Sequence, residues 1–367
     1  MVSITPDPTQ YDSQLVTKQQ VLLEQFGDFA IPALEVFPSP PLHYRQRAEF
    51  KIWQQGSRAH YAMFPDGPGS SPQFITAFPV AAKSICQLMP VLLEAINDNL
   101  ELRRKLFQIE FLSTLSGQTL VTMVYHRHLA EPWVQCARAL EQRLKIFVVG
   151  RSRKQKLVLS QDTVREVLPL ADGDTLRHFS YQQMEGCFTQ PNADICISML
   201  NWVSSVAATE DNQDLLELYC GNGNFSLPLS RYFRRVLATE ISKPLIQLAQ
   251  RNCRDNLVDN IDFVRLSAAE LTAALRGVRP FRRLRDINLE TLDFTSVLVD
   301  PPRAGLDVAT CELIQQFNSI FYISCNPTTL APNLQLLTRT HAIARLALFD
   351  QFPYTQHMEC GVFLRKR

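Results

Sequence analysis

The sequence predicts an α/β protein whose C-terminal half forms a doubly wound sheet, preceded by a mixed α+β region. From about Phe188 onward, short apolar runs alternate with helical segments, which is typical of successive βαβ units. Loops rich in glycine or carrying carboxylates follow several of these runs, and ligands of such sheets bind beyond the carboxyl ends of the strands. The 367 residues also exceed the length at which one hydrophobic core stops growing, so two domains are expected.

Composition excludes some classes of protein and leaves others open. Hydrophobic residues make up 46% of the chain and charged residues 20%, as in ordinary soluble proteins. The formal net charge is +1, so any binding to nucleic acid must come from local basic patches. The most apolar stretch, at about 85–96, is interrupted by Pro90 and Glu94, and no N-terminal signal is visible. We therefore expect no membrane partner and a cytoplasmic location.

Cysteine spacing argues against a metal or disulfide framework. The nine cysteines are odd in number and include no close pair, which disfavours disulfides, zinc sites and iron–sulfur clusters. No metal site is therefore expected. Most of these cysteines, including Cys86, Cys136 and Cys253, are expected to be buried as small hydrophobic residues.

The N-terminal half is expected to contain two segments. Apolar positions at helical spacing predict a helix from about Gln10 to Phe26, followed by a proline-rich connection, which together form a segment 1–43. Residues 44–180 are expected to form a mixed α/β domain. Its predicted elements are paired strands within 44–64 turning near Gln55-Gly-Ser57, a helix at 81–99, a hairpin of strands 107–115 and 119–125, a helix at 132–144, and a strand at 146–149.

The third segment, 181–367, is expected to be the catalytic domain with the doubly wound sheet. Its predicted strands are 215–219, 236–239, 261–266, 296–299, 321–324, 346–349 and 361–364.

A glycine loop after the first of these strands indicates a nucleoside ligand. Gly221-Asn-Gly223 allows tight turns and close approach of the backbone to a ligand. Glu240 ends the next predicted strand, where a carboxylate can accept hydrogen bonds from both ribose hydroxyls. A third glycine for a pyrophosphate is absent, so S-adenosylmethionine fits better than a dinucleotide. A plain turn with a surface glutamate is the alternative.

Several motifs together resemble a known family. They are Phe188-Thr-Gln-Pro-Asn192, Glu217-Leu-Tyr-Cys-Gly-Asn-Gly-Asn-Phe-Ser226, Val299-Asp-Pro-Pro-Arg-Ala-Gly305, Tyr322-Ile-Ser-Cys-Asn-Pro327 and His357-Met-Glu-Cys-Gly361, with Tyr44-Arg-Gln-Arg-Ala-Glu-Phe50 and Phe349-Asp-Gln-Phe-Pro-Tyr354. This set resembles the RNA uracil-C5 methyltransferases, closest to the tRNA branch that makes ribothymidine, and covers essentially the whole chain. Ribosomal members generally carry a cysteine-ligated iron–sulfur cluster, and this sequence has no close cysteine cluster.

The resemblance implies a fold and an activity. The fold is a class I S-adenosylmethionine-dependent, Rossmann-like methyltransferase domain preceded by an RNA-binding domain. The activity is methylation of uridine C5 in the T-loop of tRNA, at conventional tRNA position 54, to give 5-methyluridine. The T-arm of tRNA is then the partner, and no obligate protein partner is evident.

The residues are chemically suited to that reaction. Uracil C5 is a poor nucleophile, so a thiolate must first add to C6, and Cys325 at the end of a predicted strand is the candidate. Glu359, placed just before the last predicted strand, is the candidate base for the C5 proton. The alternatives are a buried cysteine and a surface glutamate. Arg303 occupies the place of the aromatic residue found in amino-methylating enzymes, which argues against an amine acceptor.

By the resemblance, the cofactor would be bound by residues from several loops: Gln190, Tyr219, Gly221, Asn224, Glu240 and Asp300. For Gln190, a turn residue remains the alternative.

A stacked uridine must be extruded from its loop, typically with aromatic or histidine side chains filling the gap. Phe107 and His126, at the ends of predicted strands, are the candidates, with Arg45 and Lys51 as basic neighbours. Phe50, Trp53 and Tyr125 are further aromatic possibilities, and each of these aromatic residues could belong to the core instead. The stretch 143–156 carries six basic residues and no acidic one, which suits phosphate contacts or a solvated face equally.

Two other functions stay open. The same chemistry could act on ribosomal RNA or on another T-loop-like RNA, and methylation of cytosine C5 is disfavoured by the context of the nucleophile. A tRNA-folding module, in which remodelling matters as much as catalysis, is the alternative from another class.

Overall fold

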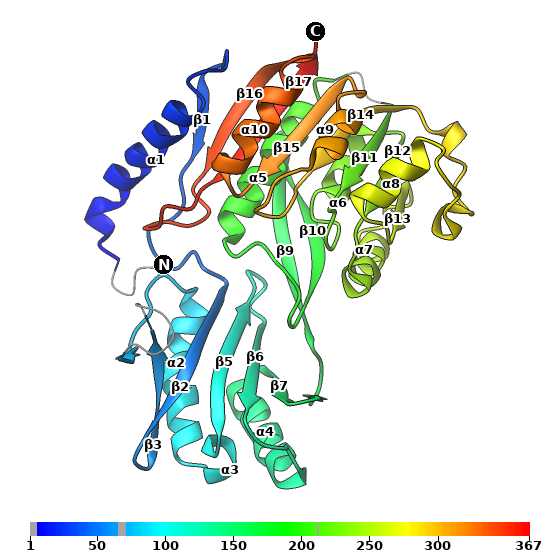
Figure 1. Cartoon of the computed structure of the whole chain (residues 1–367). Helices are drawn as coiled ribbons and strands as arrows, with labels where there is room; N and C mark the ends of the chain where they lie inside the picture. Colours follow the sequence, from blue (N-terminus) through cyan, green and yellow to red (C-terminus); the bar gives the residue numbers. More distant parts are fainter. Residues whose placement is uncertain (1–5, 65–70, 211–212) are drawn as a thin grey trace. The chain divides into compact units, whose positions relative to one another are not determined.

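A computed structural model describes residues 6–64, 71–210 and 213–367 (Figure 1). The chain forms two compact units that are discontinuous in sequence. The larger unit contains Thr9–Ser39, Leu168–Gln182 and Asp194–Arg367, and the smaller contains Pro40–Val167 and Gln183–Ala193 with the first described residues. The expected boundaries near 43 and 180 treat each domain as one continuous segment, whereas the chain passes between the units five times.

The larger unit is built on an eight-stranded sheet with the order β1-β16-β17-β15-β14-β11-β12-β13. The strands are β1 (Leu34–Phe37), β11 (Asp214–Leu218), β12 (Arg235–Thr239), β13 (Ile261–Val264), β14 (Phe294–Val299), β15 (Ser319–Ser324), β16 (His341–Phe349) and β17 (Glu359–Lys366). Only β17 pairs antiparallel to its neighbours β15 and β16; the other pairs described are parallel. The expected doubly wound sheet is confirmed.

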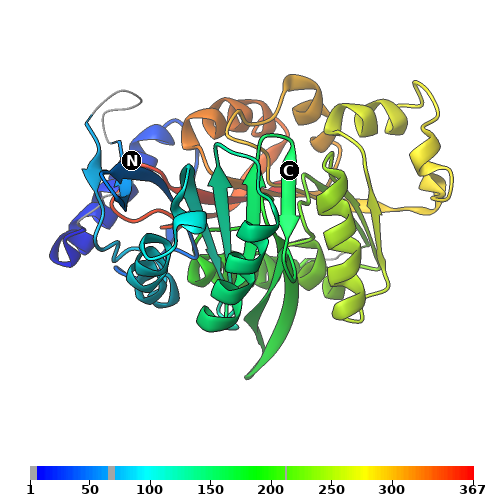
Figure 2. The same ribbon diagram turned by 90° about the horizontal axis from the view of Figure 1, so that it is seen from below.

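Helices cover both faces of this sheet. They are α1 (Tyr11–Gln25), α5 (Ala193–Ala207), α6 (Ser226–Leu229), α7 (Lys243–Asp255), α8 (Ala268–Leu275), α9 (Val308–Ile314) and α10 (Pro327–Leu337). Helices α1, α8, α9 and α10 share one core with the central strands, while α5 and α7 lie on the opposite face (Figures 1 and 2). Every residue of β15 is buried, as expected for a strand covered on both faces.

The N-terminal segment is part of this unit. Residues expected to form only a connection contain β1, which pairs parallel with β16 through Leu34↔Leu346 and Phe37↔Phe349. A four-residue strand between Pro32 and Pro38 is too short to give a periodic signal, and only its partner strand defines it. Helix α1 packs on the same sheet through Leu15 and Leu22, and Phe26, directly after the helix, joins the same core.

The smaller unit has a seven-stranded sheet with the order β4-β3-β2-β5-β6-β7-β8. Its strands are β2 (Arg47–Gln55), β3 (Arg58–Met63), β4 (Gln73–Phe74), β5 (Leu106–Ser113), β6 (Thr119–Tyr125), β7 (Phe147–Ser152) and β8 (Gln155–Val158), and its helices are α2 (Lys83–Asn97), α3 (Leu100–Arg103) and α4 (Glu131–Leu144). The predicted turn at Gln55-Gly-Ser57 is confirmed, because Gln55 pairs with Arg58 and Gly56 has φ +58°.

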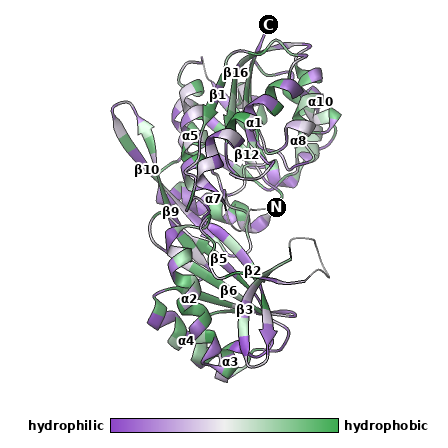
Figure 3. Cartoon of the chain, turned by 90° about the vertical axis from the view of Figure 1, so that its left-hand side faces the viewer, coloured by the Kyte–Doolittle hydropathy of each residue, from purple (hydrophilic) through white to green (hydrophobic). Residues whose placement is uncertain are grey.

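The strands of this sheet alternate between two environments. In β2, Phe50 and Ile52 are buried, while Lys51 is half-buried and Trp53 is exposed on the other face. Figure 3 shows hydrophilic residues interleaved with hydrophobic ones along β2 and β3. One face of the sheet is therefore core, and the other presents polar and aromatic side chains.

A two-stranded ribbon of β9 (Thr163–Asp172) and β10 (Thr175–Met184) was not expected from the sequence. The unit boundaries fall inside these strands, after Val167 and after Gln182. Asp172-Gly173 between two alternating runs is a hairpin signal that could have predicted it. Among the described residues, no helix is long and apolar enough to cross a membrane.

Candidate functional site

The glycine loop follows β11 with an unusual backbone. Tyr219 has φ +62°, in the left-handed region that non-glycine residues rarely adopt, and Gly221 and Gly223 also have positive φ. A Cβ on Gly223 would stand 2.7 Å from Leu227 and 3.2 Å from Phe263. Glycine is therefore required at 223 by both conformation and space, and the loop exposes its backbone at the carboxyl end of the strand.

Glu240 is brought to this loop. One carboxylate oxygen accepts a hydrogen bond from the backbone N–H of Gly221 at 3.3 Å, and the other accepts one from Ser242 N–H at 2.8 Å. The half-buried carboxylate is therefore fixed in orientation beside the glycines. The structure thus brings together Gly221 and Glu240, and their role in binding a cofactor stays a prediction.

Two buried polar atoms at the same loop have no hydrogen-bond partner among the described residues. They are Oε1 of Glu217 and Nδ2 of Asn224. The other oxygen of Glu217 accepts a bond from Ser226 Oγ at 2.5 Å, and burial raises the pKa of this carboxyl to about 8. Buried polar groups are normally satisfied, so these two atoms fit a polar ligand. Glu217 was missed as a site residue, although a charge inside the apolar run of β11 is a visible signal.

The three residues expected to take part in the reaction, Asp300, Cys325 and Glu359, lie at the ends of three neighbouring strands. Asp300 follows β14, Cys325 follows β15, and Glu359 is the first residue of β17, where it pairs with Phe349 of β16 rather than preceding the strand. Strand β15 is parallel to β14 and antiparallel to β17, so all three residues stand at one edge of the sheet. Sequence positions far apart are thus brought together.

The electrostatics of this group are unusual. Burial, together with the charges of Glu359 and Asp300, raises the pKa of the Cys325 thiol to about 11, and Arg303 opposes that rise. Burial raises the pKa of Asp300 to about 7. Burial, and then the charge of Asp300, raises the pKa of Glu359 well above its ordinary value. Perturbed acids and a thiol at one edge are typical of a catalytic site.

The carboxylate loop is held by helix α10. Backbone O of Arg303 accepts hydrogen bonds from Asn326 Nδ2 and Thr329 Oγ1, both at 3.0 Å. Asn333 bonds to both backbone groups of Leu306, at 3.0 Å each. The residues flanking Cys325 therefore also fix the loop that carries Asp300 and Arg303.

Arg303 also contacts the segment that precedes Glu359. Its Nη2 lies 3.2 Å from Nδ1 of His357, and both side chains are exposed. Burial and the positive charge of Arg303 lower the pKa of His357, so the neutral ring can accept this hydrogen bond.

A buried ion pair secures the same segment from the other side. Lys18 of α1 lies 2.6 Å from Asp350, and these side chains are 5% and 0% exposed. Lys18 Nζ also donates to Phe352 O at 2.9 Å, and Gln14 Nε2 donates to the second oxygen of Asp350 at 2.9 Å. The N-terminal helix thus fixes the start of the chain that leads to Glu359.

In the smaller unit, the RNA-binding candidates form a cluster on adjacent strands. The rings of Phe107 and His126 stack with centroids 4.2 Å apart and 21° between planes. Lys51 Nζ lies 4.4 Å from the centre of the Phe107 ring. Phe107 is half-buried and His126 is exposed. Of the other three aromatic possibilities on this sheet, Phe50 and Tyr125 are core residues at 1% and 2% exposure, whereas Trp53 is 42% exposed.

Arg45 and Gln190 belong to a different part of the smaller unit. Arg45 is half-buried, its Nε donates to Arg47 O at 2.8 Å, and its backbone bridges to Asn192. Gln190 lies on the neighbouring segment, whereas the other cofactor candidates belong to the larger unit. The cofactor role of Gln190 therefore stays a prediction, as does the RNA role of Arg45.

Two further expectations are modified. Cys86 and Cys136 are only half-buried, contrary to the expectation, while Cys253 is buried. Within the basic stretch 143–156, Arg151 pairs with Glu185 at 2.5 Å and Lys156 with Asp162 at 2.7 Å. Arg143, Lys145, Arg153 and Lys154 are exposed. Part of that stretch is thus structural.

Comparison with known proteins identifies the family of this chain. The model of the tRNA (Uracil-5-)-methyltransferase family matches residues 10–367. The chain belongs to this family. A tRNA/tmRNA (uracil-C(5))-methyltransferase of Ectopseudomonas mendocina is 53% identical over 361 residues, covering 98% of each chain. One of Vibrio atlanticus is 48% identical over 375 aligned positions, covering all of both chains.

A solved structure supports the fold. The tRNA (uracil-54, C5)-methyltransferase of Pyrococcus abyssi, in complex with S-adenosyl-L-homocysteine, matches with a TM-score of 0.72 and 22% identity, covering 96% of this chain and 83% of that one. The expected class I methyltransferase fold is thereby confirmed. In the described part of the chain, no group of three or more metal-ligating side chains is present.

Proposed function

We propose that this protein transfers a methyl group from S-adenosylmethionine to C5 of the T-loop uridine of tRNA, at conventional tRNA position 54. The observation that carries the proposal is the grouping of Cys325, Asp300 and Glu359 at the edge of the sheet that also carries the glycine loop. Family membership supports the substrate. Since tRNA is its substrate, we infer that the protein acts in the cytoplasm.

The residues present fit the cofactor. Glu240 would accept hydrogen bonds from the ribose hydroxyls, and the backbone at Gly221 and Gly223 allows close approach. The unpartnered atoms of Glu217 and Asn224 suit the polar groups of the methionine moiety. Tyr219 and Asp300, at the ends of β11 and β14, complete the site. When bound, the sulfonium supplies the methyl group as a cation equivalent.

Cys325 starts the chemistry by forming a bond from its sulfur to C6 of the uracil. The electron pair of the C5–C6 bond moves toward C5, which becomes enolate-like and can accept the methyl group. The thiol must first lose its proton, and Arg303 favours the thiolate. Because Asp300 and Glu359 disfavour it, we expect thiolate formation only when these charges are compensated by ligands.

Glu359 completes the reaction. After methylation, C5 holds both the methyl group and the original proton. Glu359 takes that proton, the electrons reform the C5–C6 bond, and the Cys325 sulfur leaves C6 as thiolate. A carboxylate with a raised pKa is a stronger base than an exposed one, and burial beside Asp300 provides that rise.

The target base must leave the loop stack before Cys325 can reach C6. The stacked pair of Phe107 and His126, with Lys51 over the ring, offers a flat surface on which displaced bases could stack beside a cation for phosphate.

Nucleoside analysis of cells lacking this protein tests the function. Loss of 5-methyluridine from tRNA, restored by the wild-type protein and not by Cys325→Ala, is the expected result. Loss from ribosomal RNA would identify the other substrate class instead. Unchanged 5-methyluridine in both RNAs, with altered tRNA folding, would favour the tRNA-folding module.

A further inference from the structure

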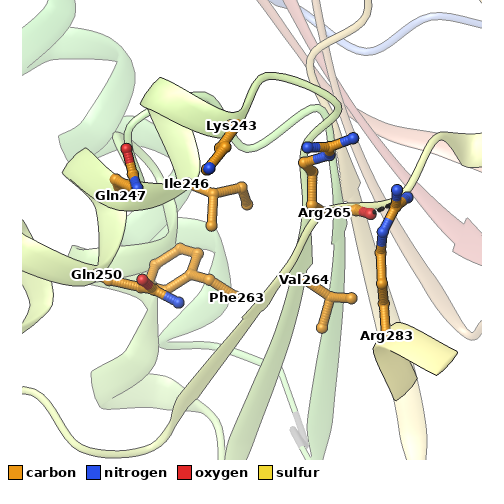
Figure 4. A pocket seen from close by; sticks show the side chains of 8 residues that line it. All are labelled: Lys243, Ile246, Gln247, Gln250, Phe263, Val264, Arg265 and Arg283. Atoms are coloured by element: carbon orange, nitrogen blue, oxygen red, sulfur yellow. Dashed lines mark hydrogen bonds between the residues drawn. The ribbon is translucent and has the colours of Figure 1, made fainter. Parts of the chain in front are cut away.

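The larger unit has a pocket at the outer edge of the sheet (Figure 4). Asp300, Cys325 and Glu359 do not line it. It lies beside β13, the last strand of the sheet, and has a volume of about 370 Å³. Ile246 from α7 and Phe263 and Val264 from β13 give it an apolar floor. Phe263 also contacts the position of Gly223, so the pocket lies behind the glycine loop.

Three cationic side chains surround this floor, and no acidic residue lines it: the cations are Lys243, Arg265 and Arg283. Lys243 and Arg265 are exposed and, within the described residues, form no salt bridge. Arg283 Nη1 donates to Arg265 O at 2.9 Å, as Figure 4 shows, and lies 3.8 Å from Glu270. Two unneutralised cations thus face an open concavity.

The pocket is continuous in sequence with an arginine-rich segment. Residues 276–285 contain five arginines and no acidic residue, in a chain whose net charge is only +1. Arg276 pairs with Glu312 at 3.3 Å and Arg285 with Asp286 at 3.2 Å, while Arg279 lies over the ring of Phe281. Arg279 and Arg282 form no salt bridge with the described residues, so the segment keeps an excess of positive charge.

The position of the pocket relates it to the reaction. Lys243 begins α7 three residues after Glu240, and Arg265 directly follows β13. Both therefore stand at the carboxyl edge of the sheet, where the glycine loop and the reacting residues also lie. The side-chain amides of Gln247 and Gln250 also line the pocket and can hydrogen-bond to ribose or phosphate oxygens.

We propose that this pocket and its arginine-rich border bind the phosphodiester backbone of the RNA substrate at nucleotides other than the target uridine. The inference rests on the proposed function, since it assumes an RNA substrate. Lys243 and Arg265 contact phosphates, and the apolar floor accommodates a ribose or base. The site contributes affinity without reading sequence.

The test compares two single charge neutralisations. Arg265→Gln removes a pocket cation, and Arg339→Gln removes an exposed cation after α10, at the opposite edge of the sheet. The dissociation constant for tRNA is measured over a range of salt concentrations. For Arg265→Gln we expect several-fold weaker binding and a salt slope smaller by about 1, as for loss of one phosphate contact. Arg339→Gln should match wild type in both.

S-adenosylmethionine affinity and melting temperature should be unchanged in both variants, and Lys243→Gln should reproduce the effect of Arg265→Gln. Wild-type affinity and slope in both pocket variants, with wild type binding and methylating tRNA, would overturn the inference and leave the proposed function intact. A wild-type protein that neither binds nor methylates tRNA would refute the proposed function itself. If inorganic phosphate raises the melting temperature of wild type but not of Arg265→Gln while RNA binding is unaffected, the pocket is a small-anion site and the RNA assignment fails.

Discussion

At the scale of residues, the chemistry depends on groups that shift one another's protonation. Burial raises the pKa of Cys325, Asp300 and Glu359; the charge of Asp300 adds to the rise at Glu359, and both carboxylates add to the rise at Cys325. A thiol with a pKa of about 11 is almost entirely protonated at neutral pH. Cys325 must therefore lose this proton before its sulfur can attack C6.

Replacing the nucleophile should abolish the reaction without affecting the cofactor. We expect Cys325→Ala to lose methyl transfer completely and to form no covalent adduct with RNA carrying 5-fluorouridine, because fluorine at C5 cannot leave as a proton does. S-adenosylmethionine affinity, measured by calorimetry, should be near normal. Cys136→Ala, at another half-buried cysteine, is the matched control and should behave as wild type. Substantial turnover by Cys325→Ala would refute the assignment.

Removing the base should stall the reaction after methylation. Glu359→Gln keeps the shape of the side chain and loses its basicity, so the C5 proton is not removed and the sulfur stays bonded to C6. We expect an enzyme–RNA adduct to accumulate on natural tRNA, visible on a denaturing gel. Glu240→Gln, which alters the cofactor side of the site, should show no such adduct. Normal turnover without an adduct in Glu359→Gln would exclude Glu359 from the mechanism.

At the scale of elements, strand pairing creates surfaces that no single element contains. Strands β5 and β6 place Phe107 beside His126, and β2 adds Lys51. In the larger unit, α1 and the segment after β16 are joined by the buried pair of Lys18 and Asp350. In both cases, the sequence of one helix or strand does not show which distant residue its side chain contacts.

Alanine variants can distinguish an RNA-binding role of Phe107 and His126 from a role in packing the core. If Phe107 and His126 stack on displaced bases, alanine at either should cost about 1 to 3 kcal/mol of tRNA binding or turnover. The S-adenosylmethionine affinity and the melting temperature of both variants should equal those of the wild type. Phe50→Ala, at a core position of the same sheet, should instead cost about 3 to 5 kcal/mol of unfolding free energy. Unchanged tRNA affinity and turnover in both folded variants would reject the stacking role.

The buried ion pair of Lys18 and Asp350 should stabilise the fold and fix the segment that leads to Glu359. Lys18→Met leaves Asp350 buried without its cation, so we expect the free energy of unfolding to fall by about 3 to 5 kcal/mol. Arg285→Gln, which breaks an exposed pair, should change it by less than about 1 kcal/mol. Denaturant titration measures both. An unfolding free energy for Lys18→Met equal to wild type would show that the pair does not fix the segment before Glu359.

At the scale of the whole molecule, raised carboxyl pKa values link stability to pH. The pKa of Asp300 is about 7 in the fold against 3.8 ordinarily. Between these values the folded state binds more protons than the unfolded chain, so this group makes stability fall as pH rises from about 4 to 7. Below both values the contribution does not change with pH.

A single substitution tests this linkage. Asp300→Asn cannot titrate, so its melting temperature should fall less than that of wild type between pH 4 and 7, with the two curves parallel below pH 4. Asp286→Asn, at an exposed carboxylate with a local arginine partner, should follow the wild-type curve. If the wild-type and Asp300→Asn curves remain parallel through pH 7, the carboxyl of Asp300 has an ordinary pKa.

Local chemistry in the sequence was enough to locate the strands that build the catalytic sheet and the loops that follow them. The apolar run of β15 ending at Cys325, the glycines after β11 and the acidic residue after β12 each carry their signal within a few residues. Doubly wound topology then places such loops at one edge, so the grouping of Cys325 with the glycine loop was also predictable.

Only the tertiary structure decided the features that depend on distant partners. Strand β1 exists because β16 pairs with it, and each of the two units is assembled from segments that are far apart in the sequence. Cys86 and Cys136 proved half-buried because exposure depends on neighbours in space rather than on residue type. The raised pKa values at Cys325, Asp300 and Glu359, the ion pair of Lys18, and the pocket beside β13 likewise arise from burial and from charges brought together by folding, which no local pattern of the sequence encodes.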